Sequence, residues 1–162
     1  MIPVSPDSSA NLPQSPAVPE SERPSGGAVS VGIVLVSHSQ ALAEAALDLA
    51  RRLIVAVDVP VELAAGLADG GLGTDPGAVV EAVERLAERC EGVLVLADLG
   101  SGIMSAEMAL EMLDPALAER TRLSAAPFVE GLLGAYGAAG IGKDLEAVAA
   151  EANGAAEAKR SQ

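Results

Sequence analysis

The chain has 162 residues, of which 50% are apolar, and a formal net charge of −13 at pH 7. This length suits a single domain with a real hydrophobic core. The negative charge repels phosphate groups, which argues against nucleic acids and anionic membranes as partners. With one Tyr, one Phe and no Trp, the core must be built from aliphatic residues, and aromatic platforms that stack bases are missing.

Cysteine content and hydropathy predict a cytoplasmic protein. The single cysteine, Cys90, cannot form an internal disulfide, which fits a reducing compartment. We interpret it as a small core residue on the apolar face of a helix. No apolar run reaches about 18 residues, so no membrane span is expected. The N-terminus also lacks the pattern of a secretory signal.

The first 28 residues differ in composition from the rest of the chain. They hold six of the ten prolines together with many serines. Such a segment buries too little apolar surface to offset the entropy that it loses on ordering. We therefore predict a disordered Pro/Ser-rich tail over residues 1–28 and one folded domain over 29–160.

The first predicted strand spans residues 29–36 and is apolar almost throughout, which is typical of a parallel strand covered on both faces. A helix should begin at Gln40, with Ser39 as its N-cap. Spacing predicts a stripe on this helix that faces the sheet. It consists of Leu42, Ala46, Leu49 and Leu53.

Two further strands are predicted at 60–64 and 93–97. A glycine-rich loop over 66–76 follows the first of them and ends at Asp75-Pro76, an N-cap followed by the first helical residue. The helix after this loop should bury Val79, Val83, Leu86 and Cys90. The strand at 93–97 should lead into a helix over 103–113 that Asp114-Pro115 ends.

The last predicted elements are a short strand over 122–125, a helix that Pro127 opens, and a helix over 144–158. Strands thus alternate with helices, which predicts a parallel sheet with helices on both faces. We expect a three-layer, doubly wound α/β fold with strand order 2-1-3-4. The inward side chains expected on the last two helices are Phe128, Val129, Leu132, Leu133 and Tyr136, then Leu145, Val148, Ala149 and Ala152.

The only histidine, His38, follows the first predicted strand. In strand order 2-1-3-4 this place adjoins Asp98, at the end of the third strand, where ligands bind in open α/β sheets. A carboxylate beside an imidazole holds one ring nitrogen and leaves the other free to attack. Two structural alternatives stay open at this point. In the first, His38 has no functional role and local hydrogen bonds satisfy its ring. In the second, Asp98 only caps a helix.

Other motifs give weaker signals. Backbone amides in the loops 73–75 and 100–102 could cradle an oxyanion, but glycine-rich loops are common connectors. The stretches 71–76 and 137–144 begin like a dinucleotide motif and a P-loop, yet Pro76 and Asp144 occupy essential positions. The sequence lacks the G-x-S-x-G elbow of a serine hydrolase, which argues against that class of enzyme. One histidine and one cysteine argue against a metal site.

The motifs Val34-Leu35-Val36-Ser37-His38-Ser39 and Asp98-Leu99-Gly100-Ser101 resemble the phosphocarrier subunit of phosphoenolpyruvate-dependent dihydroxyacetone kinase. The leading domain of that subunit belongs to the mannose-type enzyme IIA family of the phosphotransferase system. The resemblance covers about 29–159 and continues through further motifs. These are Gly73-Thr74-Asp75, Ser105-Ala106-Glu107, Leu110-Glu111-Met112-Leu113 and Ala125-Ala126-Pro127-Phe128-Val129-Glu130-Gly131.

The resemblance implies that His38 accepts a phosphoryl group from the phosphocarrier protein HPr. His38 then passes it to ADP held on a nucleotide-binding subunit, and no cofactor or metal is needed. Asp98 matches the carboxylate partner of the histidine. The family further implies a homodimer. The residues implied in phosphate binding are Ser39, Thr74, Gly100 and Ser101.

Two other functions stay open. The same fold serves mannose-class enzyme IIA in sugar uptake. A non-enzymatic module that binds a small anion or a partner protein would also explain glycine-rich loops beside a histidine.

Overall fold

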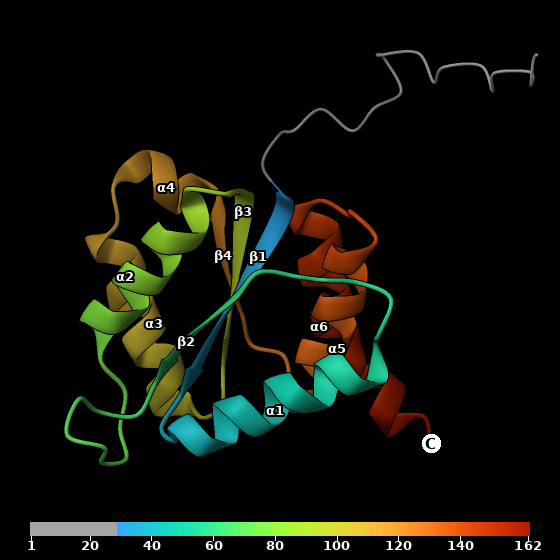
Figure 1. The fold of residues 1–162 in the computed structure, drawn as a ribbon, viewed down its shortest axis with the longest axis horizontal. Coiled ribbons are helices and arrows are strands. Elements are labelled where there is room, and N and C mark those ends of the chain that lie inside the picture. The colour runs from blue at the N-terminus through green and yellow to red at the C-terminus, as the bar shows by residue number, and fades with distance from the viewer. Residues whose placement is uncertain (1–28) are drawn as a thin grey trace, which may run out of the picture.

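The structure is a computed structural model that describes residues 29–162, so the prediction for the tail lies outside the described residues. Its strands form one parallel sheet in the order β2-β1-β3-β4, with helices on both faces (Figure 1). The predicted fold class and strand order are confirmed. The elements are β1 (Val29–Ser37), α1 (Gln40–Leu53), β2 (Val61–Ala65), α2 (Pro76–Ala87), β3 (Cys90–Ala97), α3 (Gly100–Met112), α4 (Pro115–Glu119), β4 (Thr121–Ser124), α5 (Phe128–Gly140) and α6 (Leu145–Arg160).

Strand β1 lies inside the sheet and is buried on both faces. Val31, Ile33 and Leu35 belong to a core that α1, α5 and α6 cover. The alternating residues Val34 and Val36 point to the other face, into a core under α2 and α3. This alternation explains the unbroken apolar run, because every side chain of a covered parallel strand needs an apolar neighbour.

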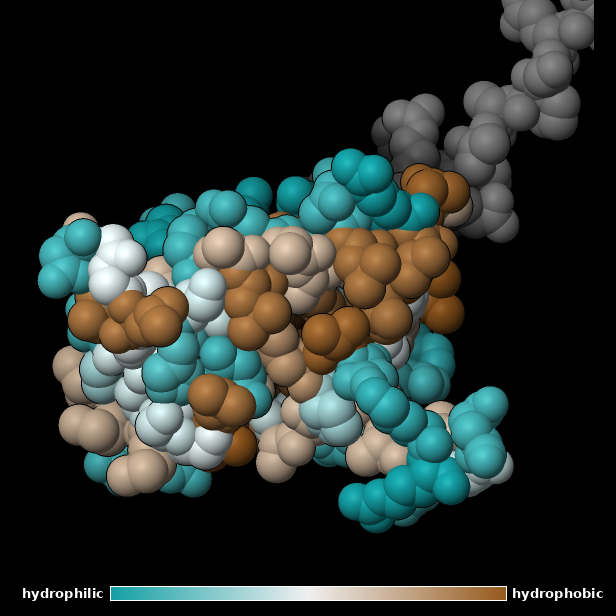
Figure 2. All heavy atoms as spheres, turned by 90° about the horizontal axis from the view of Figure 1, so that it is seen from below, coloured by the Kyte–Doolittle hydropathy of each residue, from teal (hydrophilic) through white to brown (hydrophobic). Residues whose placement is uncertain are grey.

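The predicted inward stripe of α1 is correct at Ala46 and wrong at its three leucines, because the helix is rotated. Its buried residues are Ala43, Ala46, Leu47 and Ala50, whereas the leucines expected inside are exposed. Small alanines let α1 lie close to its neighbours, which explains why this face of the helix is buried and the leucines are not. Figure 2 shows hydrophobic side chains gathered on the side seen from below, where α1 lies in Figure 1. The exposed fractions are 43% for Leu42, 41% for Leu49 and 62% for Leu53.

Cys90 is a core residue, as expected, but it does not lie on a helix. Helix α2 ends at Ala87, and Cys90 opens β3, three residues before the predicted start of that strand. Its sulfur would lie 2.9 Å from a Cβ at Gly32, so the close approach of β1 here requires glycine. Burial raises the pKa of the Cys90 thiol, and Arg89 and Arg120 oppose this rise only in part.

The connection from α3 to β4 contains a helix that sequence reasoning missed. Asp114 ends α3, as predicted, but its side chain also accepts a hydrogen bond from the Ala116 N–H and caps the short helix α4. Helix α3 itself begins at Gly100, earlier than the predicted Ile103. The earlier start of α3 is a boundary difference of the kind that sequence patterns locate poorly. Helix α4 was missed although Asp114-Pro115 is the same start signal as Asp75-Pro76.

Helices α5 and α6 pack closely on one another, as Figure 1 shows. Phe128, Leu132 and Tyr136 of α5 are buried, as are Val148 and Ala152 of α6. The other four predicted inward side chains pack against the same core while partly exposed. The predicted faces of both helices are therefore confirmed.

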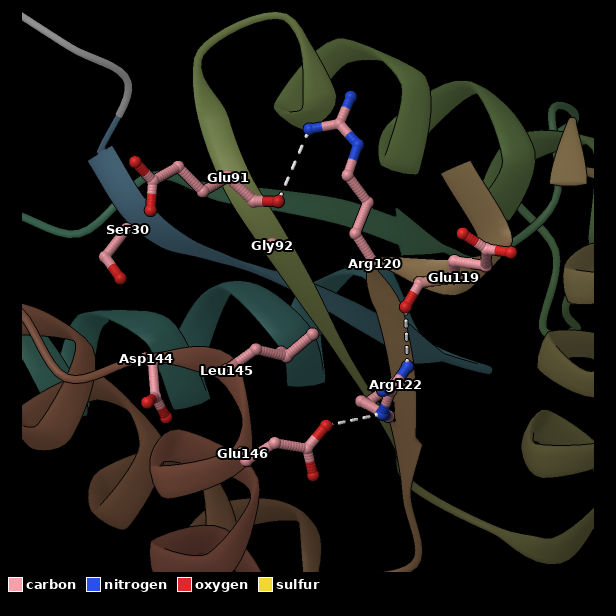
Figure 3. A pocket seen from close by; sticks show the side chains of 9 residues that line it. All are labelled: Ser30, Glu91, Gly92, Glu119, Arg120, Arg122, Asp144, Leu145 and Glu146. Carbon is pink, nitrogen blue, oxygen red and sulfur yellow. Dashed lines mark hydrogen bonds and ion pairs between the residues drawn. The ribbon is translucent and has the colours of Figure 1, made fainter. Parts of the chain in front are cut away.

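Figure 3 shows a hollow at the edge of the sheet where β1, β3 and β4 begin. Arg120 Nη1 donates to the Cys90 carbonyl oxygen at 2.8 Å. Arg122 Nε donates to Glu146 Oε1 at 2.8 Å, and its Nη1 donates to the Glu119 carbonyl oxygen at 2.9 Å. These guanidinium groups fasten β4 to β3 and α6, so we interpret the hollow as a structural junction. Among the described residues, none of the helices is long and apolar enough to span a membrane.

Candidate functional site

His38 and Asp98 lie side by side at the opposite edge, where β1 and β3 end. The two strands pair in parallel up to Val36 and Ala97. The ring nitrogen His38 Nδ1 lies 2.9 Å from Asp98 Oδ1. The adjacency expected from the strand order is therefore observed, and the histidine is not satisfied by local groups alone.

The Asp98 carboxylate receives several hydrogen bonds besides that of the ring. The backbone N–H of His38 donates to Oδ2 at 2.9 Å, and the backbone N–H of Leu99 donates to Oδ1 at 2.8 Å. The Ser37 hydroxyl lies 2.9 Å from Oδ2. Sequence reasoning did not assign Ser37 to this site. The feature that could have identified Ser37 is a hydroxyl at the end of a buried strand, where a polar group needs a hydrogen-bond partner.

Two opposing effects set the pKa of Asp98. Burial by itself raises it, but hydrogen bonds from His38 and Ser37 outweigh burial, and the pKa lies below its ordinary value. The group is therefore an ionised carboxylate at neutral pH. Since a carboxylate only accepts hydrogen bonds, the proton between the two residues belongs to Nδ1. In the neutral form of the ring, the lone pair is then on the other nitrogen, Nε2.

His38 Nε2 points to the first turn of α3, where it lies 2.7 Å from Ser101 Oγ. The His38 side chain is 24% exposed, whereas that of Asp98 is 5% exposed. No side chain caps α3 at its N-cap residue Leu99. The N–H groups of its first turn are thus available beside Nε2, together with the positive end of the helix dipole. This arrangement suits an anionic group attached to Nε2.

Gly102 lets α3 approach the pair closely. A Cβ there would lie 3.1 Å from Asp98 Oδ1 and 3.7 Å from His38 Cε1. Gly100, in contrast, has open space, because a Cβ there meets nothing within 4 Å. Sequence reasoning named Gly100 and passed over Gly102 as a site residue, since a glycine pattern does not tell which one faces a neighbour.

The loop between β2 and α2 is fastened to the same edge. The Gly73 N–H donates to the His38 carbonyl oxygen at 2.9 Å, and the Gly73 φ of 154° favours glycine. Thr74 Oγ1 lies 2.6 Å from Ser105 Oγ, which ties the loop to α3. Ser39 Oγ accepts from the Leu42 N–H at 3.2 Å and confirms the predicted N-cap. A phosphate-binding role for Ser39 and Thr74 stays a prediction.

The fold and the site together define a doubly wound α/β domain with one partly exposed imidazole that is held by a carboxylate. Within residues 29–162, no cluster of three or more His, Cys, Asp or Glu could hold a metal ion. The chain belongs to the EIIA-man family, described as PTS system fructose IIA component, whose model matches residues 32–149.

Curated relatives support this assignment. The chain is 44% identical over 134 residues to the PEP-dependent dihydroxyacetone kinase, phosphoryl donor subunit DhaM, of Klebsiella michiganensis and of Escherichia coli K12. That match covers 82% of this chain but only 28% of those relatives. A DhaM of Listeria innocua is 38% identical, over 62% of this chain and 79% of the relative. The resemblance found in the sequence is thus confirmed.

Solved structures show the same fold. A crystal structure of a protein of unknown function is 31% identical and covers 76% of this chain and 93% of its own, with a TM-score of 0.70. A sigma-54 interaction domain protein from Enterococcus faecalis has a TM-score of 0.58 at 18% identity, covering 84% of this chain and 96% of its own. At that identity the second likeness concerns the fold alone.

Proposed function

We propose that this protein is a phosphohistidine carrier of a dihydroxyacetone kinase. His38 takes a phosphoryl group from HPr and passes it to ADP on the nucleotide-binding subunit of the kinase, in the cytoplasm. The observation that carries this proposal is the pairing of Nδ1 with Asp98, which leaves Nε2 nucleophilic beside the uncapped start of α3. The family further suggests that the protein acts as a homodimer.

The chemical step uses groups that the site holds. The Nε2 lone pair attacks phosphorus, and an N–P bond forms while the N–P bond of the donor breaks and leaves its electron pair on the donor nitrogen. The positive charge that the ring then carries is stabilised by the Asp98 carboxylate on Nδ1–H. In the second transfer, an oxygen of the ADP β-phosphate attacks, and the bonding electrons return to Nε2.

The start of α3 has a role in both steps. A phosphorylated side chain carries about −1.5 to −2 charges, which the dipole and the free N–H groups of α3 can offset. The Ser101 hydroxyl is within hydrogen-bond distance of the free ring nitrogen, and we propose that it turns to donate to a phosphoryl oxygen. Positioning and charge stabilisation of this kind dominate phosphoryl transfer.

A sugar-uptake enzyme IIA is the second candidate, because the family description names a fructose IIA component. The relatives at 44% identity are instead named as phosphoryl donor subunits of dihydroxyacetone kinase. These names favour the kinase as the destination of the phosphoryl group.

The experiment starts with the protein, phosphoenolpyruvate, enzyme I and HPr. We expect one acid-labile, alkali-stable phosphate per chain, and because the chain has one histidine, its position needs no mapping. A His38→Ala variant should stay unlabelled. Equal labelling of that variant would refute the assignment of His38.

A chase distinguishes the two destinations. Labelled protein is purified and mixed with the ADP-loaded kinase subunit, where we expect loss of label from His38 and formation of ATP. Retention of label here, combined with transfer to a sugar-transport enzyme IIB, would favour the second candidate.

A further inference from the structure

Helix α3 carries an exposed row of methionines. Apart from Met1, every methionine of the chain lies on this helix, at positions 104, 108 and 112. This spacing places them on one helix face, and they are 63%, 56% and 61% exposed. The buried residues of α3, Gly102, Ala106 and Ala109, lie on its other side. We call Met104, Met108 and Met112 the methionine ridge.

The methionine ridge is continuous with the site. Ser101, the neighbour of His38 Nε2, lies in the first turn of α3, and Met104 follows three residues later on an adjacent part of the surface. From Ser101 to Met112 the helix rises about 16 Å, at 1.5 Å per residue. Leu99, at the N-cap, adds another apolar side chain that is 60% exposed. A partner that reaches Nε2 from this side therefore meets apolar surface.

Two carboxylates accompany the ridge. Glu107 and Glu111 lie on the same outward side of α3 and are exposed. Neither takes part in an ion pair within the part of the chain that the structure describes. The surface thus combines adaptable apolar side chains with free negative charge, and it is complementary to an apolar patch bordered by Lys or Arg.

We propose that the methionine ridge, with Glu107 and Glu111, docks the acceptor, that is, the protein that holds ADP and receives the phosphoryl group from His38. This inference rests on the proposed function. A protein that binds a nucleoside diphosphate surrounds it with cationic groups. We therefore expect Lys or Arg side chains around the face that it turns to His38, and these would match the carboxylates of the ridge. Flexible methionines suit a surface that must bind and release its partner in every cycle.

The test uses protein labelled to completion on His38 and repurified, so that loading by HPr does not enter the measurement. We expect Met108→Glu to raise the KM for the ADP-loaded acceptor about tenfold or more, the size of effect typical of a central interface residue. The hydrolysis rate of the phosphohistidine, a property of the site alone, should not change. Ile141→Glu is the matched control, because Ile141 is 71% exposed in the turn after α5, outside the ridge.

A charge arm tests the complementarity. Glu107→Lys combined with Glu111→Lys should raise the same KM and weaken its dependence on salt, because the attraction to a positive partner becomes repulsion. Glu157→Lys is the control, since Glu157 is an exposed carboxylate on α6, across the sheet. It changes the net charge by the same amount per substitution and should leave KM nearly unchanged.

The outcomes separate the two proposals. If wild-type protein takes no phosphate on His38, the proposed function fails. If it is loaded and Met108→Glu transfers with an unchanged KM, the docking inference is overturned while the proposed function stands. If Met108→Glu slows the initial labelling by HPr but leaves transfer to the acceptor unchanged, the ridge belongs to the donor and the docking inference is overturned. A loss of self-association without a change in KM would assign the ridge to a second copy of the chain and would overturn the inference as well.

Discussion

At the scale of single residues, the site depends on one carboxylate that accepts hydrogen bonds from several donors. Asp98 accepts from the His38 ring, from backbone N–H groups on both sides of the site and from Ser37. The Asp98 side chain thereby sets the orientation of the His38 ring and determines which ring nitrogen carries the proton. It also holds the ends of two strands together. Few substitutions preserve all three functions, because only a carboxylate offers so many acceptor sites in this space.

Asp98→Asn tests this arrangement. An amide has only one acceptor oxygen, so at least one of the present donors loses its partner. We expect a folded protein whose free energy of unfolding is lower by about 1–3 kcal/mol and whose phosphoryl transfer is at least about tenfold slower. Rapid-quench transfer and urea unfolding measure the two effects. Asp75→Asn, at the N-cap of α2, is the control and should change little, since Asn caps as well as Asp.

The lowered pKa of Asp98 predicts how stability depends on pH. The folded protein holds this carboxylate below its ordinary pKa. Its contribution to stability is therefore fully present above the pKa of an unfolded aspartate, and it is lost as pH falls through the folded pKa. The stability difference between wild type and Asp98→Asn should be largest near neutral pH and shrink in acid. Urea unfolding of both proteins from neutral to acid pH measures this difference. A stability difference that grows in acid would contradict the prediction.

At the scale of elements, α1 shows how tertiary packing selects a face. The helix is rich in Leu and Ala on more than one side, so spacing alone allowed several inward stripes. The sheet and α5 accept the alanines, which permit a close approach, and this rotation leaves Leu42, Leu49 and Leu53 exposed. The exposed leucines begin shortly after the site, in the first turn of the same helix.

Two neighbouring leucines of α1 form a matched pair for this rotation. Leu47 is 8% exposed and Leu49 is 41% exposed. We expect Leu47→Ala to lower the free energy of unfolding by about 2–4 kcal/mol, as is usual for a core leucine. Leu49→Ala should change it by less than about 1 kcal/mol. Urea unfolding measures both. If Leu49→Ala were the more destabilising of the two, the inward stripe predicted from the spacing would be correct.

At the scale of the whole molecule, charge and apolar surface are distributed unevenly. The chain has 23 acidic and 10 basic residues. Arg85, Arg89, Arg120 and Arg122 are already engaged by nearby carboxylate or carbonyl oxygens. The His38 site lies at the other edge of the sheet. A negative molecule with apolar surface beside its site should attract positively charged partners to that edge.

The same excess of negative charge predicts that salt stabilises the fold. Repulsion among carboxylates opposes the compact state, and salt screens it. The exposed ion pairs that salt also weakens contribute only about 0–1 kcal/mol each. The urea midpoint should therefore rise between about 10 mM and about 300 mM salt. Agreement between NaCl and KCl controls for specific ion effects, and a falling midpoint would mean that the ion pairs dominate.

The sequence by itself determined the strands, their order and the histidine–aspartate pair. Strands covered on both faces need unbroken apolar runs, and parallel connections of one handedness leave few topologies. Once the order was known, the ends of β1 and β3 had to meet, and His38 and Asp98 with them.

Only the tertiary structure decided the rotation of α1 and the membership of Ser37 and Gly102 in the site. A helix with apolar residues on several sides is oriented by the shape of its neighbours. A buried hydroxyl acquires its role from atoms some 60 residues away in the chain, as the contact of Ser37 with Asp98 shows. Local patterns encode burial and periodicity, whereas such contacts exist only after distant segments have packed together.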